Sequence, residues 1–422
     1  MIKQIAFLIS LLITLGIFFW TIRRLYAYLK LTKPFPIHDY GKRFNMMMEV
    51  AIGQTKILRF PFVGFLHALV FWGFLVILVG SIEMVIDGLT GTERVLGFMG
   101  GFYDVIVASG DVFAFIIAIC ILLFLARRLF LNVKRFNGIE MKHVSHMDAN
   151  IALTMIFLLM VSLLGMNMFY YYLNPDTAVG VFPVSQFVVD KFIPLHSVSH
   201  DSAHLQHEIY WWSHILLIFI FANILPYSKH FHVFMSVPNV FLSRLEPLGK
   251  LYNMPEITKE VKLMMDPNAA FTEPAEGEEI SRFGVKDVED ITWKNYLDSL
   301  TCTECGRCTS VCPANITGKK LSPRKIIMDV RARMKEKGPG LLKVGKDFDD
   351  QKALINDYIS PEELWACTTC NACALECPVN INQPSIIVDL RRYLVMEESA
   401  APGELNATFT NIENNGALAI FN

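Results

Sequence analysis

The stretch from Trp211 to His232 reads WWSHILLIFIFANILPYSKHFH and joins an apolar run to histidines at both of its ends. A helix needs roughly 20 apolar residues to cross a bilayer, and this run is close to that length. Lipid offers the backbone no hydrogen-bond partner, so such a segment must be helical. His214 stands near one end of the run and His232 just beyond the other. Ionisable side chains are costly in a membrane and usually functional, so the two histidines require an explanation.

Four further apolar segments are long enough to span a membrane. The 422 residues are 53% hydrophobic with a mean hydropathy of +0.38, which exceeds the composition of an ordinary soluble domain. The net charge is −2 and no basic patch is interleaved with aromatic residues, so nucleic acid is not expected as a partner. The five expected spans are approximately residues 5–22, 60–86, 105–126, 151–173 and 209–227.

The basic residues of the short loops predict the orientation of these spans. Residues 23–59 hold eight Lys or Arg and residues 127–150 hold five, whereas residues 87–104 and 174–208 hold one each. The two basic loops are therefore expected in the cytoplasm, the N-terminus outside, and everything after Tyr227 in the cytoplasm. The first segment has no small-residue cleavage site, so we expect a helix rather than a signal peptide. The predicted location is the bacterial inner membrane.

Eight of the nine cysteines lie in two copies of C-x2-C-x2-C-x3-C-P, namely CTECGRCTSVCP (302–313) and CTTCNACALECP (367–378). Three thiolates at this spacing wrap one face of a [4Fe-4S] cubane, and the fourth, followed by Pro, ligates the other cluster. Disulfides fit a cytoplasmic location poorly, and zinc ribbons use paired C-x2-C instead of a repeated four-cysteine run. The sequence predicts one cluster on Cys302, Cys305, Cys308 and Cys377, and the other on Cys367, Cys370, Cys373 and Cys312.

The segment between the two cysteine motifs is expected to be helical. Ser322-Pro323 is typical of a helix start, and Ser360 followed by Glu363 forms a capping-box pattern. Apolar residues recur at helical spacing after Pro384 as well. We therefore expect an α-helical dicluster ferredoxin. The predicted domains are a membrane domain at 1–244, a linker rich in Pro, Glu and Ala at 245–292, the ferredoxin domain at 293–398 and a tail at 399–422.

Histidines at two depths of the bundle are candidate haem ligands. His67 lies about two turns into the second span, and His232 follows the fifth, so both are expected near the cytoplasmic side. Paired histidines in a helical bundle suggest haem, and the absence of C-x-x-C-H from the sequence predicts a non-covalent b-type haem. His214 precedes His232 by 18 residues, roughly 27 Å along a helix, and belongs at the outer level. The alternatives are a hydrogen-bonded core histidine at His67 and an interfacial one at His232.

No second intramembrane histidine is found at the depth of His214. A histidine-rich segment outside, HSVSHDSAHLQH, places four histidines and His214 within about 80° on a continuous helix. One of them could ligate an outer iron, the stripe could bind a metal, or it could be a wet loop that lines a quinone entrance. Glu83 and Asp111 are expected to snorkel to water more than to carry protons, and Cys120 to be inert. The four histidines are His196, His200, His204 and His207.

The segment from Trp211 to Phe241 resembles the fifth helix of the respiratory nitrate reductase gamma-type cytochrome b. It is still more similar to the membrane arm of heterodisulfide-reductase-like iron–sulfur proteins and electron-transfer-flavoprotein:menaquinone oxidoreductases. The resemblance implies that His214 serves an outer haem and that His232 and His67 serve an inner one. The family's second outer ligand falls on Ile77, a departure that leaves the outer haem open. Residues 293–326 are similar to the cluster-binding segment of the same group.

The resemblance completes an all-α expectation: a five-helix transmembrane cytochrome b bundle followed by a cytoplasmic dicluster ferredoxin. In fused members a CCG domain follows, and the sequence reaches Asn422 without one. The implied partner is therefore a separate cytoplasmic protein with a CCG domain or flavin, or an electron-transfer flavoprotein. The expected function is electron transfer between the quinone pool, with menaquinone expected, one haem b, two clusters and this partner. Either direction of flow, a second haem and a membrane redox sensor stay open as alternatives.

Overall fold

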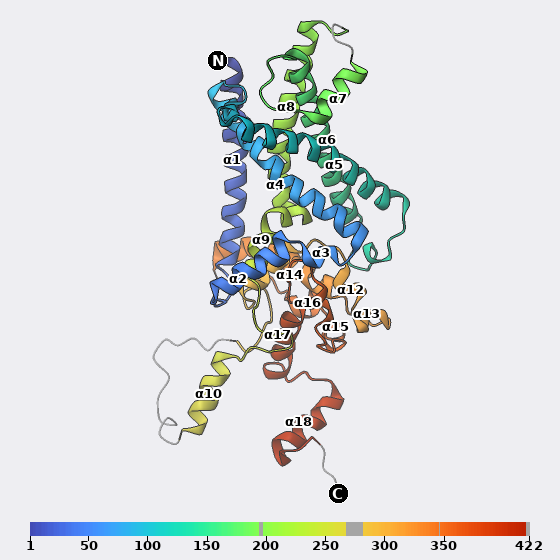
Figure 1. Ribbon diagram of the computed structural model, residues 1–422. Coiled ribbons are helices and arrows are strands. Elements are labelled where there is room, and N and C mark those ends of the chain that lie inside the picture. Colours follow the sequence, from blue (N-terminus) through green and yellow to red (C-terminus); the bar gives the residue numbers. More distant parts are fainter. Residues whose placement is uncertain (194–196, 267–281, 346, 419–422) are drawn as a thin grey trace. The chain divides into compact units, whose positions relative to one another are not determined.

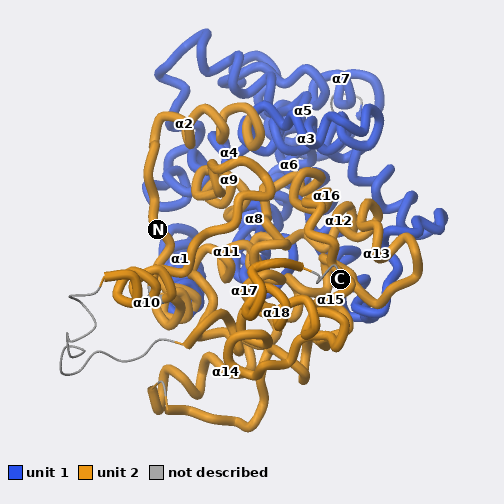
Figure 2. Tube along the Cα trace, turned by 90° about the horizontal axis from the view of Figure 1, so that it is seen from below, with its two compact units in different colours: residues 1–24, 53–233 blue, residues 25–52, 234–422 orange. Residues whose placement is uncertain are grey.

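The computed structural model describes residues 1–193, 197–266, 282–345 and 347–418. Within these ranges it is helical and has no β-strand, only isolated bridges, which confirms the all-α expectation (Figure 1). The chain forms two compact units, one of residues 1–24 and 53–233 and the other of residues 25–52 and 234–422 (Figure 2).

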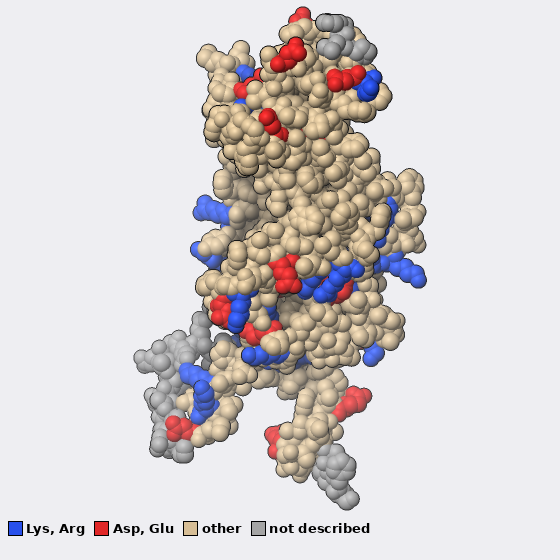
Figure 3. All heavy atoms as spheres, viewed as in Figure 1, with Lys and Arg blue, Asp and Glu red and all other residues tan. Residues whose placement is uncertain are grey.

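The first unit is built on long apolar helices. Five helices are long and apolar enough to cross a membrane, the last continuing through a short turn to Tyr227, and they confirm the five spans predicted from sequence. On the face seen in Figure 3, charged side chains lie mostly toward the ends of this bundle. Its helices are α1 (Ile2–Leu29, which continues into the second unit), α3 (Thr55–Leu58), α4 (Pro61–Thr90), α5 (Gly101–Phe130), α6 (His143–Leu173), α7 (Pro183–Phe192) and α8 (His200–Ile224).

Small residues let the long helices approach closely. A Cβ on Gly165 of α6 would lie 2.6 Å from the ring of Tyr210 on α8, so only glycine fits at this crossing. Gly73 of α4 has the same role, because a Cβ there would lie 2.7 Å from the Phe113 ring of α5. Close backbone approach over small residues is the usual means of packing helices in lipid. These contacts fix the helices that carry the candidate site residues.

The second unit consists of shorter helices whose starts follow the expected capping chemistry. The Ser322 hydroxyl accepts a hydrogen bond from the Lys325 backbone N–H, and Ser360 and Glu363 form a reciprocal capping box. The helices are α2 (Tyr40–Met46), α9 (His232–Phe241), α10 (Pro255–Met265), α11 (Trp293–Thr301), α12 (Arg307–Ser310), α13 (Pro313–Ile316), α14 (Pro323–Val344), α15 (Pro361–Trp365), α16 (Ala372–Glu376), α17 (Gln383–Met396) and α18 (Gly403–Asn415).

Residues 25–52, a cytoplasmic loop in the sequence prediction, are part of the second unit. The Lys33 backbone N–H donates to Ile291 O at 2.8 Å, and Trp293 N–H donates back to Lys33 O at 2.9 Å. The buried Arg43 guanidinium donates to the carbonyl oxygen of Ser243 at 2.6 Å. The predicted linker falls in part on residues 267–281, which lie outside the described residues.

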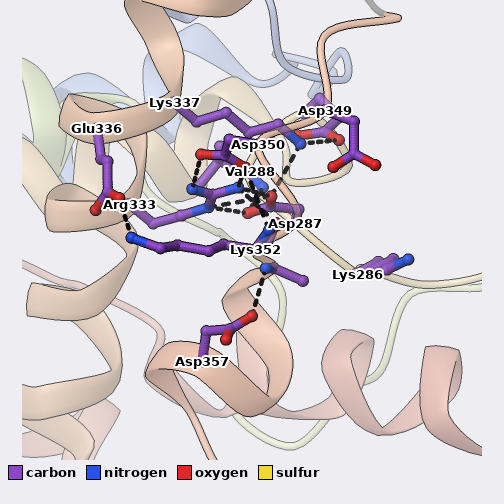
Figure 4. A network of polar contacts seen from close by, with 12 residues as sticks. Lys286, Asp287, Val288, Arg333, Glu336, Lys337, Asp349, Asp350, Lys352 and Asp357 are labelled. Carbon is purple, nitrogen blue, oxygen red and sulfur yellow. Dashed lines mark hydrogen bonds and ion pairs between the residues drawn. The ribbon is translucent and has the colours of Figure 1, made fainter.

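A buried ion network ties the segment that precedes α11 to α14 (Figure 4). The Arg333 side chain is fully buried and contacts Asp287 at 2.6 Å and Asp350 at 2.6 Å. Lys337, one turn further on, contacts the same Asp287 at 2.9 Å. Each buried charge in this network has a partner of opposite sign. The attraction between partners offsets the cost of removing the charges from water, which a single buried ion could not do.

Candidate redox sites

The second cysteine motif gathers around a cysteine of the first. Cys367, Cys370 and Cys373 line one small cavity together with Cys312, the residue before α13. Burial raises the pKa of Cys373 to about 12, and the neighbouring thiols of Cys367 and Cys312 add to the rise. Burial, together with the neighbouring thiols of Cys312 and Cys370, also raises the pKa of Cys367, whereas ligation of a metal requires the thiolate form. The structure thus places Cys312 beside the second motif, and the assignment of these four thiols to one cluster stays a prediction.

The other four thiols form the reciprocal set. Burial raises the pKa of Cys377 to about 12, and the thiols of Cys305 and Cys302 add to the rise. Burial also raises the pKa of Cys308, with further contributions from Cys305, Cys302 and Cys377. None of the nine cysteines, all of which lie in the described part of the chain, forms a disulfide. Among the described residues no group of three or more His, Cys, Asp or Glu is arranged to hold a single metal ion.

Cationic side chains beside the two sets were not found from the sequence. Arg331 of α14 donates to the carbonyl oxygen of Cys302 at 3.3 Å and forms an ion pair with Glu304. Arg391 of α17 donates to the carbonyl oxygen of Cys367 and, through Nε, to Leu364 O at 3.0 Å. Each motif therefore has one arginine at its first cysteine. The arginines lie 29 and 24 residues from these cysteines, so no motif spacing could reveal them.

His67 and His232 both belong to the first unit. His67 is in the second turn of α4, and His232 is the first residue of α9, just after the turns that end α8. The Nδ1–H of His232 donates to Lys229 O at 3.1 Å, which leaves Nε2 to bind a ligand. Burial lowers the pKa of His232 and favours the neutral ring that a metal binds. The sequence reasoning passed over the mostly buried His230, whose ring lies 5.9 Å from that of His232, although KHFH could have indicated it.

A cavity of about 430 Å³ lies in the first unit, beside the predicted outer ligand His214. Four histidines on one face of α8 line this cavity: His200, His204, His207 and His214. Residues 200–214 are therefore helical, and the alternative prediction of a loop over these residues is wrong. His200 and His204 are exposed, whereas His207 and His214 are buried. The Nδ1–H of His214 donates to Leu159 O at 3.0 Å, so Nε2 is again the nitrogen left for a ligand. His196 lies outside the described residues.

Two carboxylates at this cavity correct the sequence interpretation. Glu83 and Asp111 do not snorkel to water; both are buried. Glu83 accepts from the Tyr103 hydroxyl at 2.9 Å and the Leu96 backbone N–H at 3.0 Å. Asp111 accepts from the Val184 and Ser185 backbone N–H groups at 2.8 and 2.9 Å and so caps the N-terminus of α7. Ile77, at the position that the resemblance assigns to a second outer ligand, lines the cavity with an apolar side chain.

The class of protein follows from a comparison with known families. Residues 301–381 match the 4Fe-4S dicluster domain, which supports two [4Fe-4S] clusters. The chain is homologous to iron–sulfur oxidoreductases, as the resemblance implied. The chain has five helices that could cross a membrane, and its relatives are oxidoreductases. Together with the dicluster domain, these findings support membrane-associated electron transfer through iron–sulfur clusters.

Three relatives illustrate the similarity. The probable iron-sulfur-binding oxidoreductase FadF of Bacillus subtilis is 28% identical over 98% of this chain and 59% of its own length. The EtfAB:quinone oxidoreductase of Syntrophomonas wolfei is 28% identical over 86% of this chain and 50% of its own length. One component of a ferredoxin/F(420)H(2)-dependent CoB-CoM heterodisulfide reductase of Methanosarcina acetivorans is 36% identical over 25% of this chain and 52% of its own length. The chain thus spans between 50% and 59% of the length of these relatives. No solved structure matches it significantly.

Proposed function

We propose that this chain is an integral-membrane subunit that carries electrons between the quinone pool, a b-type haem, two [4Fe-4S] clusters and a cytoplasmic redox partner. The observation that carries the proposal is that a helical unit with buried histidines around a cavity and a unit with two interlocked cysteine sets belong to one chain. The partner is a CCG-domain iron–sulfur protein, a flavoprotein or an electron-transfer flavoprotein. The N-terminus lies outside the inner membrane and the cysteine-bearing unit in the cytoplasm.

His67 and His232 are the proposed ligands of the inner haem, and His214 is a candidate for an outer one. In His232 and His214 a backbone carbonyl oxygen accepts the Nδ1–H, which orients the ring and increases the basicity of Nε2. Each ring could then ligate a haem iron through Nε2. A bound haem would supply a one-electron carrier within the apolar bundle. His232 is the first residue of α9, and the later residues of this helix belong to the second unit.

The outer cavity is the proposed quinone site. Its wall combines apolar side chains such as Val76, Leu163 and Met166, which suit a quinone ring, with many polar and ionisable groups, which suit the quinone oxygens. Quinol oxidation releases two protons and quinone reduction takes them up. The stripe that runs from buried His207 to exposed His204 and His200 offers titratable groups between the cavity and water for either direction.

Reoxidation in liposomes tests electron transfer from the chain to quinone. The purified full-length chain is reduced with dithionite under anaerobic conditions, the excess is removed, and a short-chain menaquinone is added. Reoxidation of both the b-type Soret band and the cluster absorbance within seconds supports electron transfer to quinone. Clusters that stay reduced while quinone is present would indicate a redox sensor and refute the transfer function.

A further inference from the structure

The two cysteine sets differ in their access to water. Cys302, Cys308 and Cys377 are buried and Cys305 is partly buried. In the other set, Cys373 and Cys312 are buried, but Cys370 is exposed and Cys367 partly buried. Backbone N–H donors do not separate the sets, because Thr369 donates to Cys367 Sγ and Ile381 to Cys377 Sγ, both at 3.4 Å. Solvent exposure is one of the properties that set the reduction potential of a cluster.

The cations beside the two sets differ as well. Arg331, at Cys302, forms an ion pair with Glu304, and buried Lys294, which is near Cys377, is paired with Asp298. Arg391 instead donates to the carbonyl oxygens of Leu364 and Cys367 and lies 4.9 Å from the Trp365 ring. Of the carboxylates on the described residues, none forms an ion pair with Arg391.

Charge balance turns these differences into an order of reduction. A cluster that accepts an electron becomes more negative, and this state is stabilised by water and by an unneutralised cation nearby. An arginine paired with a carboxylate contributes little, because the opposite charges largely cancel at a distance. Both observations act in the same direction. They favour the electron on the Cys367 set.

We infer that Arg391 tunes the Cys367 set to hold an electron in preference to the Cys302 set. The inference rests on the proposed function, since both sets must carry [4Fe-4S] clusters. With both clusters bound, one electron would pass from a [4Fe-4S]1+ cluster on the Cys302 set to a [4Fe-4S]2+ cluster on the Cys367 set, so that the first would be oxidised to 2+ and the second reduced to 1+. No proton moves and no bond breaks. The exposed loop around Cys370 becomes the end of the pathway at which the chain exchanges electrons with its cytoplasmic partner.

An EPR-monitored redox titration of the full-length protein with dithionite tests the inference. Wild type should show two midpoint potentials. Arg391→Gln should lower only the higher midpoint potential, by about 59 mV. This shift corresponds to about a tenfold change in how one electron is distributed between the two clusters. Arg391→Lys, which keeps the charge, should restore most of the difference. Arg392→Gln is the matched control, since Arg392 is the next residue of α17, is paired with Asp389 at 2.9 Å, and should move neither potential.

A second variant keeps the inference falsifiable if Arg391→Gln does not assemble. Glu304→Gln frees Arg331 from its partner and should raise only the lower potential. Unchanged potentials in both variants, or a shift of the wrong cluster, would overturn the inference while leaving the proposed function intact. A wild-type protein without acid-labile sulfide would instead refute the proposed function itself.

Discussion

The Nδ1 of His232 lies 3.1 Å from the carbonyl oxygen of Lys229, and the ring therefore donates its N–H to the backbone. His214, one bilayer's length earlier in the chain, makes the same contact with Leu159 O at 3.0 Å. A carbonyl oxygen can only accept, so both rings are fixed in the tautomer that leaves Nε2 free to bind a metal. The two histidines near opposite ends of the fifth span thus share the tautomer in which Nε2 can bind a metal.

Haem content is expected to depend on particular histidines. We expect His67→Ala and His232→Ala to abolish haem b, because one imidazole alone holds a non-covalent haem weakly. His207→Ala should leave the haem content unchanged, although His207 is buried in the same unit. A pyridine haemochrome assay on each purified variant measures the outcome. Haem retained in His67→Ala, or lost only in His207→Ala, would assign the inner iron to other residues.

The interlocked cysteines predict which variants behave alike. Cys312→Ser should damage the same cluster as Cys370→Ser, although the two residues belong to different motifs, because they line one cavity. Cys377→Ser should in turn resemble Cys305→Ser. Iron content and the EPR spectrum of the remaining reduced cluster measure this pairing. If Cys312→Ser instead matched Cys305→Ser, each motif would bind its own cluster and the assignment would be wrong.

The ion network of Figure 4 predicts a large effect on stability. Replacing Arg333 with Met removes one of the two cationic partners of Asp287 and the arginine partner of Asp350, and breaking a buried pair in this way costs about 3–5 kcal/mol. Lys352→Met is the control, because its ion pair with Glu336 is exposed to water and contributes little to stability. Chemical denaturation followed by cluster absorbance compares the two. Equal losses would show that burial of Arg333 does not matter.

Asp111 should be needed for the stability of the outer end of the bundle. Asp111→Asn keeps the shape but removes the charge that caps α7, with an expected cost of about 2 kcal/mol. Asp201→Asn, at a fully exposed side chain, should have no measurable effect. Thermal unfolding in detergent micelles gives the comparison. A wild-type melting temperature in Asp111→Asn would contradict the capping role.

The sequence was sufficient for the features that repeat locally. The five spans follow from apolar length, and the Ser360 and Glu363 box from a spacing of three residues. The cysteine grouping follows from the geometry of the cubane. Contacts between residues far apart in the chain leave no such pattern. Asp111 caps a helix that begins 72 residues later, Lys33 pairs with a segment near residue 291, and Arg391 approaches Cys367 from α17. Burial of Glu83 and Asp111 was missed because their partners belong to this class.

The cofactor content of the purified full-length chain tests the central claim most directly. Pyridine haemochrome, non-haem iron and acid-labile sulfide are measured on one preparation after anaerobic purification. The account predicts haem b together with about eight non-haem irons and eight sulfides per chain, as two [4Fe-4S] clusters require. A second equivalent of haem would extend the account to His214. A preparation with a full complement of iron and sulfide but no Soret band would contradict an electron route through the membrane.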